Sequence, residues 1–218
     1  MQVVSFNPEE GAQRLIFISG WAGYPGLFPR LSTRAHFFHP FISHELHSIH
    51  DFLLKQNPEI VVSWSLGAHI CLGLLSGIQT KHLFLVSPFL DFTRYTPPQK
   101  IHEMIRGLQR DPVATVRWFW RLCGVKDKPG SIPEKDQPGL ERGLNHLLNS
   151  RSYPVESETS SPVTLIHGSR DKIVPHQASR ELQEHLKGSR LVTTPHGHFI
   201  PEENIVEIIH EQTGAKIL

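Results

Sequence analysis

The chain has 218 residues, a formal net charge of +1 and 39% hydrophobic residues. This length and apolar share suit one domain with a sizeable core and room for an insertion. A charge so near zero gives no argument for nucleic-acid binding, and no apolar run approaches the roughly 20 residues of a membrane helix. The two cysteines, Cys71 and Cys123, lie in apolar helical contexts, and the first eight residues lack the pattern of a signal peptide. We therefore expect reduced thiols and a cytoplasmic protein.

Strands and helices are predicted to alternate through the first 90 residues. Short apolar segments predict strands, the second of them broken by histidines and a proline, at 14–19, 35–41, 60–63 and 81–86. Ser43 can cap a helix that ends at Gln56, and a helix-compatible stretch covers 66–78. This alternation predicts an α/β fold with a mostly parallel central sheet that helices cover on both faces.

Ser65 follows the third predicted strand directly. Branched apolar residues at 60–62 lead through Ser63 and Trp64 to Ser65, and the helix-compatible stretch begins at once. This is the sequence pattern of a nucleophile elbow, in which a strand ends in a sharp turn that raises the serine hydroxyl above the sheet. Small residues are needed two positions before and after the serine, because strand and helix nearly touch there. Gly67 meets this requirement, whereas Ser63 stands where the pattern has glycine.

The block from about residue 92 to 151 contains no convincing strand and interrupts the alternation. Three helices are predicted in it, from the spacing of Ile101, Met104, Ile105 and Leu108, from Asp111-Pro112 through Cys123, and from Leu140, Leu144, Leu147 and Leu148. We expect residues 1–91 and 152–218 to form an α/β-hydrolase core and 92–151 a helical lid. A plain helical excursion packed on the core is the alternative, but the aromatic residues of the second helix favour a lid that lines an acyl pocket.

Two further strands are predicted near the end of the chain, at 162–168 and 191–194. The first runs into a turn with Asp171, and the second into a loop with His198. Helices are predicted over 175–187 and 201–212, each closed by a glycine. The order Ser65, Asp171, His198 is the order of α/β-hydrolase triads, and each residue comes just after a predicted strand.

These three residues supply what nucleophilic attack on a carbonyl requires. A serine hydroxyl is a poor nucleophile at neutral pH and needs a base that takes its proton. His198 would be that base, because the reference pKa of imidazole, about 6.5, suits a base at pH 7. Asp171 would hold the imidazole in the right tautomer and stabilise its positive charge. The backbone N–H groups of Leu66 and of Trp21, in the loop after the first strand, are the predicted oxyanion donors.

Other polar residues near these motifs have a second interpretation. His196 could be the base in place of His198, although Gly197-His198-Phe199 fits the histidine loop better. His167 is interpreted as a structural histidine, and Ser87 and Asp91 as the hinge of the lid. A metal site is conceivable at three histidines spaced three residues apart, but no carboxylate cluster accompanies them, and we interpret them as a solvated helix face: His44, His47 and His50. No metal or cofactor is predicted.

The charge of the chain is unevenly distributed. Residues 91–151 carry a net charge of +4, and the rest of the chain carries −3. Two pairs of arginines four residues apart each project from one helix face, namely Arg106 with Arg110 and Arg117 with Arg121. These arginines are either a solvated face or a docking site for an acidic partner.

Four stretches together resemble the pimeloyl-acyl-carrier-protein methyl ester carboxylesterases of biotin synthesis: the Gly-Trp-Ala-Gly loop at 20–23, the Trp-Ser-Leu-Gly elbow at 64–67, and residues 110–119 and 139–144 of the lid. The resemblance implies hydrolysis of the methyl ester of a pimeloyl chain carried on acyl carrier protein, which releases methanol and the free ω-carboxylate. It implies substrate contacts from Trp21, Ser65, Leu66, Phe119, Trp120 and Cys123. It also implies that the acidic carrier meets lid arginines, for which the candidates are Arg106, Arg110, Arg117 and Arg121.

Two alternative functions stay open on the sequence. The first is a generalist short-chain carboxylesterase or thioesterase with the same triad and no carrier partner. The second is a non-catalytic α/β-hydrolase-fold protein that binds a ligand or partner, which the complete triad argues against.

Overall fold

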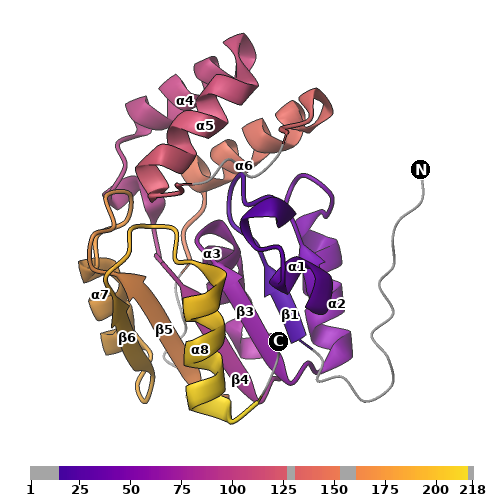
Figure 1. The fold of residues 1–218 in the computed structure, drawn as a ribbon, viewed down its shortest axis with the longest axis vertical. Helices are drawn as coiled ribbons and strands as arrows, with labels where there is room; N and C mark the ends of the chain where they lie inside the picture. The colour runs from indigo at the N-terminus through magenta and orange to yellow at the C-terminus, as the bar shows by residue number, and fades with distance from the viewer. Residues whose placement is uncertain (1–14, 127–130, 153–160, 216–218) are drawn as a thin grey trace.

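Six parallel strands form one sheet in the computed structural model, which describes residues 15–126, 131–152 and 161–215. The strands are β1 Leu15–Ile18, β2 His36–Phe38, β3 Ile60–Trp64, β4 His82–Val86, β5 Val163–Gly168 and β6 Arg190–Thr194. Their order across the sheet is β2-β1-β3-β4-β5-β6 (Figure 1), and every pairing is parallel. The α/β prediction is confirmed, and each predicted strand lies where the sequence pattern placed it.

Apolar runs form the central strands because both faces of the sheet are covered. All five residues of β3 are buried. One core cluster takes Val62 and Phe84 on one face of the sheet, and a second takes Val61 and Leu83 on the other. This alternation explains why these strands have no polar face, as is typical of parallel sheets.

Helices cover both faces of the sheet (Figure 1). One face packs on α2 Leu46–Gln56, α3 Leu66–Gly73 and α7 Gln177–His185. The other packs on α1 Leu31–Arg34 and α8 Glu202–Thr213. Short 3-10 turns lie at η1 Pro25–Leu27, η2 Leu75–Gly77, η3 Phe92–Arg94 and η4 Glu134–Asp136. The predicted helix 66–78 is therefore an α-helix that ends at Gly73 and is followed by η2.

The predicted cap of α2 is wrong. The residue that precedes the helix is Glu45, and it makes no side-chain capping bond. The Ser43 hydroxyl contacts the ring nitrogen Nδ1 of His44 instead, at 3.0 Å. An N-cap acts only from the position directly before the first helical residue, and Ser43 lies two residues too early.

Three helices follow β4 and lie over the carboxyl ends of the strands (Figure 1): α4 Pro98–Arg110, α5 Pro112–Cys123 and α6 Gln137–Asn149. Asp111 caps α5 as predicted, since its Oδ1 accepts the Ala114 N–H at 2.8 Å. We call this segment the helical insertion. Its described residues contain no strand, which agrees with the absence of a strand pattern.

The two ends of the helical insertion are joined at the core. Arg151 Nε donates to Asp91 Oδ2 at 2.7 Å, which links the end of the segment to its start. His69, one turn along α3 from Ser65, accepts a hydrogen bond at Nε2 from the Ser150 hydroxyl at 2.8 Å. The Ser152 hydroxyl donates to the His69 carbonyl at 2.8 Å. The insertion is thus fastened to the same helix that begins at the elbow.

Two buried histidines should make the fold sensitive to acid. Burial lowers the pKa of His69 to about 4, and burial together with His44 lowers the pKa of His39 to about 3. Unfolded histidines take up protons near pH 6.5, so the unfolded state binds more protons below that pH. The free energy of unfolding should therefore fall as pH drops from about 6.5 to about 4, by roughly 1.4 kcal/mol per pH unit for each histidine.

Urea unfolding followed by tryptophan fluorescence between pH 7 and pH 4.5 measures this slope. His69→Gln should flatten it by about the share of one histidine, whereas His47→Gln, at an exposed position of α2, should leave it unchanged. Equal slopes in wild type and His69→Gln would contradict the assignment of His69.

Candidate active site

Ser65 occupies a strained turn between β3 and α3. Its backbone has φ +53° and ψ −112°, and its N–H donates to the Val86 carbonyl at 2.8 Å. A Cβ at Gly67 would collide with the backbone oxygens of Ile18 and Ser19 at the end of β1, so α3 touches this neighbouring strand and only glycine fits there. Ser63, in the place of the other small residue, is fully buried. The turn raises the Ser65 side chain at the carboxyl end of the sheet.

A continuous series of hydrogen bonds joins Ser65, His198 and Asp171. The Ser65 hydroxyl lies 2.7 Å from His198 Nε2, and His198 Nδ1 lies 2.7 Å from Asp171 Oδ2. The side chains of His198 and Asp171 are completely buried, and Ser65 is 6% exposed. The structure brings together the three residues that the sequence analysis selected, although they come from three separate loops.

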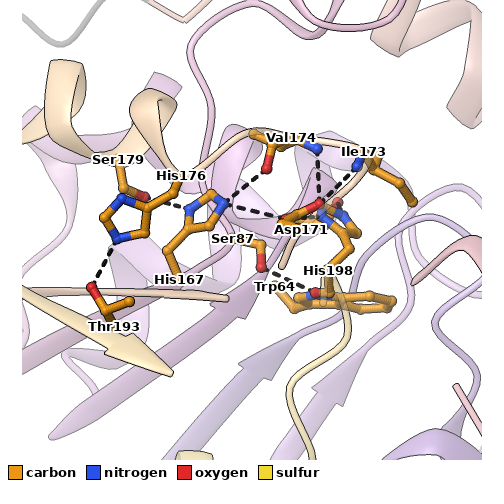
Figure 2. Close-up of polar contacts among 11 residues, drawn as sticks. Trp64, Ser87, His167, Asp171, Ile173, Val174, His176, Ser179, Thr193 and His198 are labelled. Carbon is orange, nitrogen blue, oxygen red and sulfur yellow. Dashed lines mark hydrogen bonds and ion pairs between the residues drawn. The ribbon is translucent and has the colours of Figure 1, made fainter. Parts of the chain in front are cut away.

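The histidine loop is held by its backbone. The His198 carbonyl accepts two hydrogen bonds, from the Trp64 indole N–H at 2.9 Å and from the Ser87 hydroxyl at 3.0 Å (Figure 2). Ser87 was predicted to be part of a hinge, and its contact with the histidine loop was missed. Nothing in the sequence signals this contact, because the two residues are 111 positions apart.

Asp171 is fixed as an anion. Its Oδ1 accepts the N–H groups of Ile173 and Val174 at 2.8 and 2.9 Å. Burial alone would raise the pKa of this carboxyl group, but the imidazoles of His198 and His167 and their hydrogen bonds outweigh it. The pKa of Asp171 therefore lies well below its ordinary value. A carboxylate in this state can orient an imidazole and stabilise its positive charge.

His196 lies outside this series. It is partly buried, and its carbonyl accepts the Arg170 N–H at 2.9 Å. Among the described residues, none accepts or donates a hydrogen bond at its ring. The geometry therefore favours His198 over the alternative base.

The loop after β1 is tied to the helical insertion by two indole groups. The Trp21 indole N–H donates to the Leu140 carbonyl at 2.8 Å, and the Trp120 indole N–H donates to the Ala22 carbonyl at 2.9 Å. Ala22 has φ +52°, a conformation that needs support from its surroundings. The backbone N–H groups of Trp21 and Leu66 donate no hydrogen bond to any other described residue. Both amides are therefore available to an acceptor next to Ser65.

A cavity of about 690 Å³ lies between α4, α5 and the loop after Asp171. Its apolar wall includes Met104, Trp118, Phe119 and Ile173. Phe119 also packs edge-on against the Trp21 ring, with centroids 4.7 Å apart, so it borders both the cavity and the loop beside Ser65.

Of the six predicted substrate contacts, only Phe119 lines this cavity. The other five are buried and lie outside its lining, namely Trp21, Ser65, Leu66, Trp120 and Cys123. Trp120 holds the Ala22 carbonyl, and the Cys123 carbonyl accepts the Phe199 N–H at 2.9 Å. Both residues fasten α5 to loops at the carboxyl end of the sheet.

All four predicted carrier-binding arginines are exposed on α4 and α5: Arg106, Arg110, Arg117 and Arg121. None forms an ion pair with another described residue. Arg121 lies at the cavity, together with Lys100 and Lys172. Beside these arginines, Trp118 and Leu122 are 44% and 40% exposed.

The described ranges of the chain contain no group of three histidine, cysteine, aspartate or glutamate side chains placed to hold a metal ion. His47 and His50 lie on α2, whereas His44 precedes the helix, so the predicted helix face of three histidines is wrong for His44. None of the helices in the described ranges is both long enough and apolar enough to cross a membrane.

The parallel sheet, the serine in a strained strand-to-helix turn and the histidine bonded to it define a serine hydrolase with an α/β-hydrolase fold. The family model Serine hydrolase (FSH1) matches residues 40–207, and the chain belongs to this family.

Individual relatives agree with this assignment. The chain is 31% identical over 159 residues to a pimeloyl-[acyl-carrier protein] methyl ester esterase of Nitrosomonas europaea, covering 63% of either chain. It is 24% identical to the protein of the same name from Neisseria meningitidis, over 84% of this chain and 85% of that one. An esterase from Exiguobacterium antarcticum has the same fold, with a TM-score of 0.71 at 15% identity over 94% of this chain and 93% of that one. The match thus spans less than two thirds of the Nitrosomonas relative.

Proposed function

We propose that this serine hydrolase is a carboxylesterase in which Ser65 is the nucleophile, His198 the base and Asp171 the orienting acid. The hydrogen-bonded series from Ser65 to Asp171 carries the proposal. In the first step the Ser65 oxygen attacks the ester carbonyl while its proton passes to His198 Nε2. The alkoxy group leaves as an alcohol with that proton, and an acyl-enzyme remains. Water, deprotonated by the same imidazole, then releases the acid.

The negative charge of each tetrahedral intermediate needs donors next to Ser65. We assign this role to the N–H groups of Trp21 and Leu66, which have no acceptor among the described residues. Besides Trp21 and Leu66, we expect Ser65 and Phe119 to lie beside the acyl group. Trp120 and Cys123, which the resemblance implied as contacts, support the loops around the site from behind.

For the substrate, we propose the methyl ester of a pimeloyl chain carried on acyl carrier protein. Hydrolysis frees the ω-carboxylate and methanol, as a step of biotin synthesis. The names of the two relatives support this choice, and so does the apolar cavity beside Phe119. Cys71 and Cys123 are buried and unbridged, which supports a cytoplasmic location.

We further propose that residues 92–151 are a lid on a core of 1–91 and 152–218, and that the carrier docks on this lid. Residues 91–151 carry a net charge of +4, and this charge and the exposed arginines suit an acidic protein. The lid also carries both indole contacts to the loop after β1, so lid and oxyanion loop form one packed unit.

The test is steady-state hydrolysis of methyl esters of C4 to C12 dicarboxylic acids, free and linked to the carrier. Arg110→Glu with Arg117→Glu should raise KM for the carrier-linked ester and leave a small soluble ester nearly unchanged, because both arginines are exposed and neither lines the cavity. Added salt should slow the wild type on the carrier substrate alone, since exposed charges are screened within about 8 Å at physiological ionic strength.

The matched control reverses the charge of two exposed lysines at the opposite end of the sheet, Lys55→Glu with Lys187→Glu. This variant should hydrolyse both substrates like the wild type. Equal losses on both substrates in the arginine variant would mean that the arginines support the lid fold. No loss on either would favour a generalist esterase or thioesterase. Failure of the wild type to react with a fluorophosphonate would favour a non-catalytic protein.

A further inference from the structure

A second imidazole contacts the carboxylate of Asp171. His167, near the end of β5, is completely buried, and its Nε2 lies 3.3 Å from Asp171 Oδ2 (Figure 2). This is the same oxygen that His198 Nδ1 contacts at 2.7 Å. Oδ1 is occupied by two backbone N–H groups of the loop that follows Asp171. All of the usual acceptor positions of the carboxylate are therefore in use.

The neighbours of His167 fix its tautomer. Nε2 also lies 3.0 Å from the Val174 carbonyl oxygen, so both groups that face it are acceptors and Nε2 must carry a hydrogen. Nδ1 lies 2.7 Å from the hydroxyl of Ser179, a completely buried residue of α7. That hydroxyl donates to Nδ1 when the ring is neutral.

The ionisable groups around the pair are few. His176, from the start of α7, packs edge-on against the His167 ring with centroids 5.5 Å apart, and its Nε2 contacts the Thr193 hydroxyl. The buried thiol of Cys123 approaches Asp171 from α5, and burial keeps that thiol protonated by raising its pKa. Asp171 thus faces two imidazoles, of which one is bonded to Ser65, and a thiol that stays protonated and uncharged.

We propose that His167 is a positioning residue of this site: its Nε2–H holds Asp171 Oδ2 in place and draws part of the carboxylate's charge away from His198. The inference rests on the proposed roles of Ser65, His198 and Asp171. When two donors share one carboxylate oxygen, each hydrogen bond is weaker than the bond that a single donor would form. The imidazolium of His198 is then stabilised less than it would be by an unshared carboxylate, and the neutral base persists to lower pH.

Two substitutions separate this role from packing. His167→Asn places an amide where Nδ1 lies, so it can still bond Ser179 but is too short to reach Asp171. His167→Gln places an amide nitrogen near the position of Nε2 and keeps the donor. Both remove the ring and leave a polar side chain in the same buried site, so each is the control for the other.

The readout is the acid limb of kcat/KM against pH, on a small soluble ester. His167→Asn should shift the midpoint of this limb to higher pH by about 0.5 to 1 unit, because Asp171 then stabilises the His198 imidazolium without a second donor on the same oxygen. His167→Gln should leave it within about 0.2 units of the wild type. If both variants match the wild type, or if both move by the same amount, the donor has no such role and His167 only fills space.

Two measurements do not depend on ester hydrolysis, and the second of them uses no variant. In a Ser65→Ala background, the NMR titration midpoint of the His198 ring should rise in His167→Asn by the same amount. This would hold even if the proposed reaction were wrong, whereas retained activity in Ser65→Ala alone would overturn only the reaction. In the wild-type protein, ¹⁵N-histidine spectra should show His167 as the Nε2–H tautomer with a slowly exchanging proton. An Nδ1–H tautomer would overturn the proposal without any variant.

Discussion

Ser65→Ala should lower kcat by roughly 10⁴- to 10⁶-fold and leave the fold unchanged. The substitution removes the only atom that can form the acyl-enzyme. The backbone hydrogen bond from the Ser65 N–H to the Val86 carbonyl survives, and alanine is no larger than serine in the turn. The residual rate would come from binding and from the oxyanion donors, which do not need the hydroxyl. Steady-state kinetics on a soluble methyl ester measures the loss.

Ser63→Ala is the matched control. Ser63 lies two residues earlier, on β3, and is completely buried. Its hydroxyl donates a long hydrogen bond to the Phe84 carbonyl at 3.4 Å and is hydrogen-bonded to the buried thiol of Cys71. This variant should keep nearly full activity and react with a fluorophosphonate like the wild type, whereas Ser65→Ala should not react. Normal hydrolysis by a folded Ser65→Ala protein would exclude the acyl-enzyme mechanism.

The elbow could be predicted from the sequence because its requirements are local. The helix that starts at the elbow passes so close to the neighbouring strand β1 that Gly67 has no room for a side chain, which is why the pattern needs small residues there. The order of Ser65, Asp171 and His198 added the long-range part, since parallel strands bring all of their carboxyl ends to one edge. The sheet and the position of the triad follow from these two facts.

The helical insertion was predicted in outline but not in its contacts. Periodicity shows that Trp120 is on the buried face of α5, but not that its indole N–H bonds to the Ala22 carbonyl, 98 residues earlier. The family resemblance assigned Trp120 to the substrate, and the structure adds a contact that holds the loop after β1. The hydrogen bonds of His167 and Ser87 could not be predicted for the same reason, because each depends on how separate loops approach one another.

The choice between two histidines in one loop is the second large expected effect. His198→Ala should resemble Ser65→Ala, with a kcat loss of roughly 10⁴- to 10⁶-fold, because the hydroxyl then has no base. His196→Ala should remain active, since Ser65 and Asp171 are hydrogen-bonded to the ring of His198 and not to that of His196. Kinetics on the same soluble ester compares the two variants.

The two substitutions are well matched, because both histidines hold the loop through their carbonyl oxygens and not through their rings. The His196 carbonyl accepts the Arg170 N–H, and the His198 carbonyl accepts the Trp64 and Ser87 donors. Alanine keeps these backbone bonds at either position, so the loop should stay in place and only the imidazole is lost. An active His198→Ala variant beside an inactive His196→Ala variant would reverse the assignment of the base. Loss of activity in both would show that the loop itself had moved, which circular dichroism and a Tm measurement on each variant would detect.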